Sequence, residues 1–439
     1  MKHPLEYSAP RATMDPMDAE TSADALHAQL ALLCEHSVAP PALAPFSGLR
    51  ALRARLQALA ASGEAGPVEE AMLGNAFTRE GRYLEAIGAY ERAVALAPEF
   101  AQAHLAIAEL ASMLHDETRG AAHRARALAL QRCFLDPLPV GDRLPIVLLL
   151  RDAAYSVNAP LELLLDRTRV AIHKCYVEGE VALPPHAVAI CATGYASDAE
   201  HALARVEALA AASGRAPLDS PARLRGTARE TLDATLGGIA GVHACATRVV
   251  ARDAMPALAL PALVRPRDTH AGRGLDLVSE PAQLEAHLRR FPASSYHVTP
   301  FVEYRSADGF YRKYRAIVVD GVAFPYHCAI SPRWMVHYRG SPMREHAWMR
   351  AEEARYLNTP EREVPGWGER LAAIARALDL EYVGIDFSIA PDGTLVVFEA
   401  DGAMLVHDED PHDLFSYKRP HVARIREALH ALILRRARP

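Results

Sequence analysis

The chain has 439 residues, of which half are hydrophobic and 23% are charged, a composition that excludes a disordered or fibrous chain and allows roughly two to four folded domains. The formal net charge is −6, so the overall positive charge of a nucleic-acid-binding protein is missing. Apolar runs fall well short of the roughly 18 residues of a membrane helix, and no signal-peptide-like run follows Met1. We therefore expect a cytoplasmic protein. We expect neither a nucleic-acid nor a membrane partner.

The basic and sulfur-containing side chains restrict the chemistry that the chain can perform. All but four of its 48 basic residues are arginine, so cationic groups at any site must be mainly guanidinium groups. The cysteines form no C-x-x-C pair and lack histidines at zinc-site spacing, which is typical of buried thiols in a reducing compartment. We interpret them as small apolar core residues. They are Cys34, Cys133, Cys175, Cys191, Cys245 and Cys328.

The first part of the chain is predicted to be helical. Residues 1–18 show no periodicity, and we expect a loose leader there. Apolar residues recur at helical spacing over residues 24–38 and 49–59, with a proline break between the two segments, which predicts two helices. The helical pattern continues beyond them, so residues 19–136 are predicted to form one all-α domain.

Small and aromatic residues recur at fixed offsets between residues 69 and 98. They are Leu73, Gly74, Phe77, Gly81, Tyr83, Ala86, Tyr90, Ala93 and Pro98. The pattern resembles a tetratricopeptide repeat, and a weaker copy covers residues 101–136; chance agreement within an alanine-rich helical pair is the alternative interpretation. Such repeats form concave surfaces, so the resemblance implies a protein or peptide partner, or self-association into a homodimer.

After residue 139 the pattern changes from helical to alternating. Short apolar runs typical of strands are separated by helical segments, which is the order of a small open α/β sheet. The predicted strands are 146–150, 170–177 and 187–192, and the predicted helices are 160–165 and 198–212. The chain from residue 140 to about residue 250 is therefore predicted to contain a second, α/β domain.

The remaining residues predict an α+β region. Strands are predicted at 262–265, 296–302, 383–390 and 394–400, a strand pair at 314–330, and helices at 281–291, at 367–378 and from His421 onward. The strands at 383–390 and 394–400 are joined by a Pro-Asp-Gly turn.

Three carboxylates lie on, or just beyond, the two strands joined by that turn. Glu399 and Asp401 are two residues apart and share one face of their strand, and Asp386 lies on the partner strand. Three carboxylates in an apolar setting would repel one another unless a cation neutralised them, and Mg²⁺ prefers such oxygen ligands. The pattern therefore predicts a magnesium site, and a solvated strand end is the alternative.

A second feature lies upstream, where the strand at 262–265 ends in Arg265 and runs into a loop containing Gly272 and Gly274. A cation followed by a glycine-rich loop can hold phosphate groups through the guanidinium group and backbone N–H groups. A Gly-x-Gly pattern alone is weak evidence, and without the three carboxylates a plain turn explains it better.

Together these features resemble the ATP-grasp superfamily of carboxylate-amine ligases, which includes glutathione synthetase and D-alanine:D-alanine ligase. The resemblance covers residues 215–402, and its landmarks occur in the family's order. It implies an α/β domain at 140–225 that helps to form the substrate pocket, and an ATP-grasp domain at 226–439 with a hinge near 299–303. The expected fold is thus multidomain: an all-α helical repeat, an α/β domain and an α+β ATP-grasp domain.

The resemblance also implies roles for individual residues. The ATP-binding set is Arg248, Arg265, Gly272, Gly274, Phe301 and Val302. Arg248 and Arg265 replace lysines of the family, and arginine keeps the charge that phosphates require. Arg315 would contact the transferred phosphate, with Arg265 as the second catalytic cation. Asp386, Glu399 and Asp401 would hold two Mg²⁺ ions, although Asp401 replaces the family's asparagine.

The implied reaction is the ATP-dependent activation of a carboxylate as an acyl phosphate, followed by attack of an amine to form an amide or peptide bond. The substrates would then be a small-molecule or peptide carboxylate and an amine. Candidate substrate-contacting residues are Lys313, His327, Ser331, Trp334, His337 and His407. Two alternatives stay open: a kinase or ATPase that stops after phosphorylation, and an adaptor whose ATP-grasp unit is degenerate.

Overall fold

The computed structural model describes residues 49–136 and 145–437, apart from short gaps at 153–156, 167–168, 195–198, 268, 270–271, 339, 403, 408–409 and 411. The expected leader at 1–18 and the expected helix at 24–38 lie outside the described residues. Within these ranges, no helix has the length and apolar character needed to cross a lipid bilayer.

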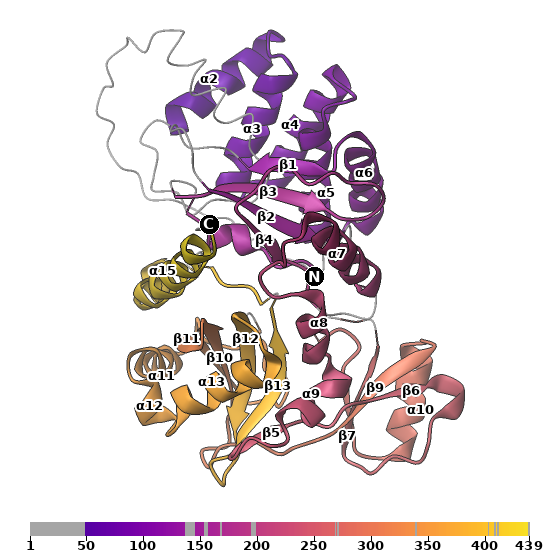
Figure 1. The fold of residues 1–439 in the computed structure, drawn as a ribbon, viewed down its shortest axis with the longest axis vertical. Coiled ribbons are helices and arrows are strands. Elements are labelled where there is room, and N and C mark those ends of the chain that lie inside the picture. The colour runs from indigo at the N-terminus through magenta and orange to yellow at the C-terminus, as the bar shows by residue number, and fades with distance from the viewer. Residues whose placement is uncertain are drawn as a thin grey trace.

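The described part of the amino-terminal region is a stack of helices, drawn at the top of Figure 1. Its elements are α2 (Leu49–Ser62), α3 (Pro67–Arg79), α4 (Tyr83–Leu96), α5 (Ala101–Met113) and α6 (Glu117–Leu130). One apolar cluster joins α2, α3, α4 and α5, so these helices share a core. The helix predicted at 49–59 is confirmed as α2, whereas the tetratricopeptide resemblance stays a prediction.

Helices α3 and α4 approach each other closely at Gly74. A Cβ atom added to Gly74 would lie 2.6 Å from Cε1 of Tyr90, whose ring is fully buried. The Tyr90 hydroxyl donates a hydrogen bond of 2.6 Å to Oδ1 of Asn75, so the ring is held in place. A larger residue at position 74 must therefore displace a fixed aromatic ring.

We expect Gly74→Ala to lower the free energy of unfolding by about 1–3 kcal/mol, because overpacking displaces Tyr90. Gly88→Ala is the matched control, since Gly88 lies inside α4 and an added Cβ would meet only the Arg92 side chain at 3.8 Å. That control should gain about 0.5–1 kcal/mol from helix propensity. Urea unfolding of both variants measures the difference, and equal values would contradict the close packing at Gly74.

The next region contains a four-stranded sheet, here called sheet I. Its strands are β1 (Cys133–Asp136), β2 (Ile146–Arg151), β3 (Ala171–Tyr176) and β4 (Val188–Cys191), in the order β1-β3-β2-β4. Strands β2, β3 and β4 are parallel, and β1 is antiparallel to β3. The three predicted strands are confirmed, as is the helix at 198–212, which is α7 (Glu200–Ser213). The short edge strand β1 was not predicted, because four residues carry too little pattern.

Sheet I joins the helical stack through both apolar and charged contacts. Phe134 of β1 and Tyr176 of β3 pack edge to face, with ring centroids 5.9 Å apart, in a cluster with residues of α5 and α6. Lys174 of β3 is fully buried, and its Nζ lies 3.8 Å from Oε1 of Glu109 in α5. The helices therefore pack directly on the sheet.

Two further sheets form the lower part of the molecule in Figure 1. Sheet II has the order β11-β10-β12-β13-β5 and contains β5 (Val242–Ala244), β10 (Tyr311–Val319), β11 (Val322–Ser331), β12 (Tyr382–Ile389) and β13 (Leu395–Asp401). Sheet III is antiparallel, has the order β6-β9-β7-β8, and contains β6 (Arg248–Ala251), β7 (Ala262–Pro266), β8 (Asp276–Val278) and β9 (Ser295–Pro300). The predicted strands of this region are confirmed.

Helices cover these sheets and connect them to sheet I. They are α8 (Pro221–Leu224), α9 (Arg229–Leu236), α10 (Pro281–Arg290), α11 (Ala347–Asn358), α12 (Pro360–Glu363), α13 (Trp367–Leu378), α14 (His412–Phe415) and α15 (Arg419–Arg436). Helix α15 shares one apolar cluster with strands of both sheet I and sheet II, so it packs between them. Helices α10 and α13 confirm the predictions, whereas α9 and α11 were not predicted.

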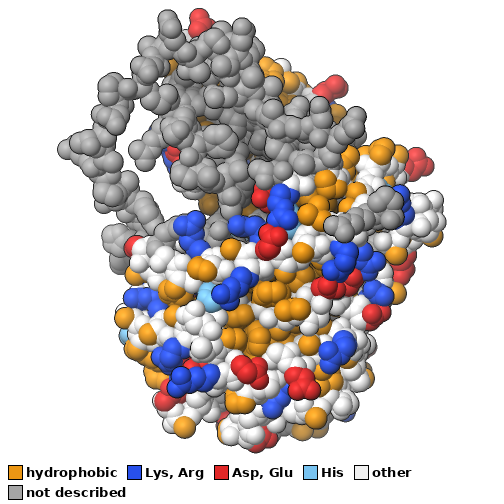
Figure 2. Space-filling view, turned by 60° about the vertical axis from the view of Figure 1, so that its left-hand side comes forward, with side chains coloured by type: hydrophobic (Ala, Val, Ile, Leu, Met, Phe, Trp, Pro, Cys, Tyr) orange, Lys and Arg blue, Asp and Glu red, His pale blue; other side chains and the backbone are white. Residues whose placement is uncertain are grey.

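The surface drawn in Figure 2 carries charges of both signs. Lysine and arginine side chains are interspersed with aspartate and glutamate side chains around an area of apolar side chains. Among the described residues visible on that face, no continuous basic strip appears. This mixture agrees with the slightly negative net charge of the chain.

Candidate functional site

A cavity of about 460 Å³ lies between sheet II and sheet III. Its polar lining residues include Arg229, Thr247, Arg265, His297, Thr299, Lys313, Arg315, His337, Asp386, Glu399 and Asp401. Its less polar lining includes Gly272, Phe301, Val302, Tyr304, Trp334, Phe398 and Met404. The residues come from both sheets and from the connections between them, so the cavity depends on the packing of the two sheets.

The floor of the cavity is a row of polar side chains that crosses sheet II. In the strand register Arg315 of β10 is opposite Asp386 of β12, and Asp386 is opposite Glu399 of β13. Asp401 follows Glu399 by two residues on β13 and is opposite Gly384 of β12. Because side chains alternate along a strand, Asp401 lies on the same face as Asp386 and Glu399. The predicted common face of the three carboxylates is therefore confirmed.

Asp386 is held by two cations. Arg315 donates to it from Nε at 2.6 Å and from Nη2 at 2.9 Å, and Lys313 donates from Nζ at 2.8 Å. Burial alone would raise the pKa of Asp386, which is 2% exposed, but the charges of Arg315 and Lys313 outweigh it and lower the pKa well below its usual range. Asp386 is therefore a carboxylate at any physiological pH.

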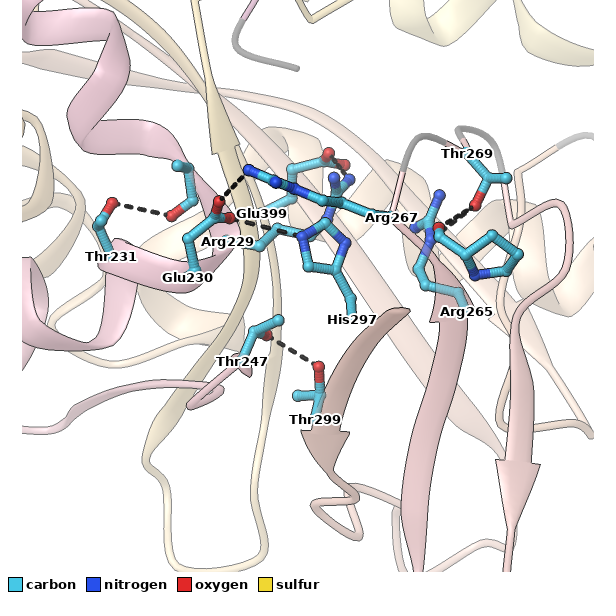
Figure 3. Close-up of polar contacts among 12 residues, drawn as sticks. Arg229, Glu230, Thr231, Thr247, Arg265, Arg267, Thr269, His297, Thr299 and Glu399 are labelled. Carbon is cyan, nitrogen blue, oxygen red and sulfur yellow. Dashed lines mark hydrogen bonds and ion pairs between the residues drawn. The ribbon is translucent and has the colours of Figure 1, made fainter. Parts of the chain in front are cut away.

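Glu399 is paired with a cation from a distant part of the chain. Arg229, at the start of α9, donates to Oε1 of Glu399. Burial raises the pKa of Glu399, but the charges of Arg229, Lys313 and Arg315 together outweigh it, and the net pKa lies below the ordinary value. Figure 3 shows Arg229 reaching across to Glu399 beside Arg267 and His297.

The arrangement of the three carboxylates differs from the predicted magnesium site in one respect. The carboxylates share a face but do not converge on one point, and among the described residues no group of three or more His, Cys, Asp or Glu side chains is arranged to hold a metal ion. The cations of Lys313 and Arg315 neutralise Asp386 instead, and the cation of Arg229 neutralises Glu399. The donor set itself, which consists of hard carboxylate oxygens, fits Mg²⁺ in chemistry.

Arg265 lies across the cavity on β7 and is not fully paired. Its Nε donates to Oγ1 of Thr269 at 3.2 Å, but Nη2 is buried without a hydrogen-bond partner. Burial and then the neighbouring Arg229 lower the pKa of Arg265 to about 10, so the side chain is still a cation at neutral pH. A buried guanidinium group with an unused donor is a favourable site for an anionic ligand.

His297 of β9 is opposite Arg265 in the strand register, and it lines the same wall. Neither ring nitrogen has a hydrogen-bond partner, although Oε2 of Glu230 lies 3.5 Å from Nε2. Burial lowers the pKa of His297 to about 4, with Arg229 and Arg265 adding to the effect, so the imidazole is neutral. Glu230 also accepts a hydrogen bond of 3.3 Å from Nη2 of Arg267 (Figure 3).

The other end of the cavity is less polar. The rings of Phe301 and Trp334 pack edge to face, with centroids 6.1 Å apart, and the hydroxyls of Thr247 and Thr299 are 2.8 Å apart. The backbone N–H of Phe301 already donates to the carbonyl of Pro261 at 3.1 Å. Of the two predicted ATP-binding residues at the hinge, Phe301 thus has its N–H engaged, which leaves Val302 as the better candidate donor.

Gly272 brings the β7–β8 connection close to the segment that follows β11. It adopts a φ of +73°, and an added Cβ would overlap the ring of His337. Burial lowers the pKa of His337, with a smaller contribution from Lys313. The glycine is therefore needed both for the backbone conformation and for the close approach.

The structure brings most of the predicted site residues to the cavity, but not all of them. Arg248, Gly274, His327, Ser331 and His407 do not line it. Arg248 is opposite Val298, so alternation turns it to the face of sheet III away from Thr299, and it is exposed. Gly274 packs against Pro266, and the backbone N–H of His407 donates to the Tyr326 hydroxyl at 3.0 Å.

Several lining residues were not predicted as site residues, namely Arg229, Thr247, His297, Thr299, Tyr304 and Met404. Arg229 is separated from Glu399 by 170 residues, and no local pattern indicates that they pair. His297 had a usable signal, because a histidine between two apolar strand residues is unusual and its alternation matches that of Thr299.

Comparisons with known proteins give similar structures but no similar sequences. No protein-family model matches the chain, and no curated protein matches it. An ATP-grasp RimK domain protein from Sphaerobacter thermophilus is 18% identical, covers 66% of this chain and 99% of its own, and has a TM-score of 0.39.

Two other solved structures are similar in the same way. The D-cycloserine synthetase DcsG is 18% identical over 66% of this chain and 99% of its own, with a TM-score of 0.43. An L-amino acid ligase from Bacillus licheniformis is 13% identical over 53% of this chain and 61% of its own, with a TM-score of 0.33. These three structures are thus named as an ATP-grasp protein, a synthetase and a ligase.

Proposed function

We propose that this protein is an ATP-dependent ligase that couples a carboxylate to an amine and releases ADP and phosphate. The observation that carries the proposal is the position of Arg265. This buried cation has an unused donor, and it faces the row formed by Arg315, Asp386 and Glu399 across one cavity. Such an arrangement suits a phosphate chain bound between the two sheets.

The proposed reaction is the one that the ATP-grasp resemblance implies. A carboxylate oxygen of the substrate attacks the γ-phosphorus of ATP, and the bond from that phosphorus to the ADP oxygen breaks. The amine then attacks the carbonyl carbon of the acyl phosphate, inorganic phosphate leaves, and the amine loses a proton to give the amide. Phosphoryl transfer requires positioning and charge neutralisation more than a protein nucleophile, which the cations Arg265 and Arg315 would supply.

Magnesium would bind at the carboxylates of Asp386, Glu399 and Asp401, and it would supply charge neutralisation for the phosphates. For Asp386 to serve as a ligand, Lys313 and Arg315 must release at least one of its oxygens. A bound phosphate chain offers these two cations replacement acceptors. Lys313, Trp334 and His337 line the same cavity and are the proposed contacts to the acid or amine substrate.

The proposal is tested by incubating the protein with ATP and pools of carboxylates and amines, with mass detection of ADP and of new amides. We expect ADP to form only, or much faster, when an acid and an amine are both present. A phosphorylated substrate that accumulates as the final product would favour a kinase instead. Absence of both nucleotide binding and turnover would favour the adaptor alternative.

A matched pair of variants tests the role of Arg265 in the same assay. Arg265→Met should reduce ADP formation by about 100-fold, because a preorganised cation at the phosphates is lost. Arg248→Met should leave the rate almost unchanged, since Arg248 lies on the same small sheet but faces away from the cavity. Equal loss in both variants would contradict the proposed phosphate position.

A further inference from the structure

Two cysteines face each other across the junction between the helical stack and sheet I. Cys133 of β1 is directly opposite Cys175 of β3 in an antiparallel pair. The N–H of Tyr176 donates to the carbonyl of Arg132 at 2.9 Å, which makes the two cysteines a non-hydrogen-bonded pair. The Cα atoms in such pairs are about 4.5 Å apart, within the range of about 4.4–6.8 Å that a disulfide spans.

The two thiols are not equivalent. Cys175 is fully buried in the cluster beneath α7, whereas Cys133 is only half-buried at the margin of that cluster. A hydrogen bond from Cys175 lowers the pKa of Cys133, and the same bond together with burial raises the pKa of Cys175. The accessible sulfur is thus the better nucleophile, and the buried sulfur is its protonated neighbour.

The other described cysteines have neither a lowered pKa nor a cysteine as register partner. Burial raises the pKa of Cys191, Cys245 and Cys328. Within the described strands, Cys133 and Cys175 are the only two cysteines that lie opposite each other in a strand pair. Position and chemistry therefore single out the same pair.

We propose that Cys133 and Cys175 form a reversible disulfide that links β1 to β3. With a low-molecular-weight disulfide such as glutathione disulfide as the oxidant, the Cys133 thiolate attacks one sulfur and releases one glutathione thiolate. The Cys175 sulfur, after losing its proton, then attacks the Cys133 sulfur of the mixed disulfide and releases the second glutathione. The two cysteines are oxidised by two electrons, and the glutathione disulfide is reduced to two thiols.

The position of the pair gives the bond a structural consequence. Strand β1 begins three residues after α6 ends, and it is the edge strand of sheet I. A bond to the neighbouring strand would fix that edge covalently, and with it the attachment of the helical stack. Cys133 and Cys175 lie on the face of sheet I that packs against α7, at the margin of that apolar cluster. Phe134 lies on the opposite face, so its contact with Tyr176 need not change when the bond forms.

The experiment treats the reduced full-length protein with glutathione disulfide, blocks the remaining thiols, and maps tryptic peptides without reduction. Trypsin cleaves after Arg132 and Lys174, so each cysteine begins its own peptide. We expect a crosslinked pair of peptides that begin at Cys133 and Cys175, together with the loss of two titratable thiols. Dithiothreitol should restore both thiols.

Variants separate this link from nonspecific oxidation. Cys133→Ser and Cys175→Ala should each abolish the crosslink, and the half-buried position of Cys133 makes the first substitution mild for folding. Cys191→Ser is the matched control and should retain the crosslink. Glutathione that remains on Cys133 in the folded wild-type protein, or a link from Cys133 to any other cysteine, would overturn the proposal.

Discussion

Glu399→Gln is expected to lower magnesium-dependent ATP turnover by at least about 100-fold while the protein stays folded. Glutamine keeps the shape of the side chain but removes the charge that would bind the metal and that pairs with Arg229. Because the loss concerns a metal ligand, the Mg²⁺ concentration that gives half-maximal rate should also rise. Steady-state ADP release at several Mg²⁺ concentrations measures both effects.

The control for this substitution is Glu285→Gln. Glu285 is an exposed carboxylate on α10, and it does not line the cavity. This variant should show wild-type turnover and magnesium dependence. If Glu399→Gln keeps its melting temperature and also keeps the wild-type magnesium dependence, Glu399 does not hold the metal, whatever happens to the rate.

Glu162→Gln is expected to destabilise the protein by about 3–5 kcal/mol, because it leaves buried cations without their carboxylate. Glu162 pairs with Arg151 of β2, and its Oε1 lies 3.1 Å from Nζ of Lys174. All three side chains are buried where the helical stack meets sheet I. Urea unfolding measures the loss, and the exposed Glu180→Gln in the same domain should change stability by less than about 0.5 kcal/mol.

The same carboxylate gives the stability a defined pH dependence. Burial alone would raise the pKa of Glu162, but the charges of Arg151 and Lys174 lower it to about 2, from about 4.5 when unfolded. A depressed pKa stabilises the folded state above pH 4.5, and this contribution, about 3 kcal/mol, is lost as the pH falls from 4.5 toward 2. The wild type should therefore lose more stability over that interval than Glu162→Gln, and parallel losses would contradict the assignment.

Local sequence patterns were enough to predict the order and type of most elements. Hydrophobic periodicity located the strands of sheet II and the helix at 367–378, because both signals are local and repeat within a few residues. Alternation on β13 also determined that Glu399 and Asp401 share a face. The Pro391–Gly393 turn made β12 and β13 neighbours, which brought Asp386 to the same face.

The groups that neutralise those carboxylates could be identified only in the folded protein. Arg315 and Lys313 are more than 70 residues from Asp386, and Arg229 is 170 residues from Glu399. Which distant strand pairs with which, and in what register, depends on long-range packing that no local period encodes.

The same reason explains the remaining differences between prediction and structure. Register placed Arg248 on the outer face of sheet III and His297 on the inner one, although both lie on strands of similar apolar pattern. It also brought Cys133 and Cys175 together, two cysteines that the sequence presented only as scattered apolar residues. A shift of one residue in either strand pairing would turn these side chains to the opposite faces of their sheets. The register exists only in the folded sheet, and it decided the chemistry of both the cavity and the cysteine pair.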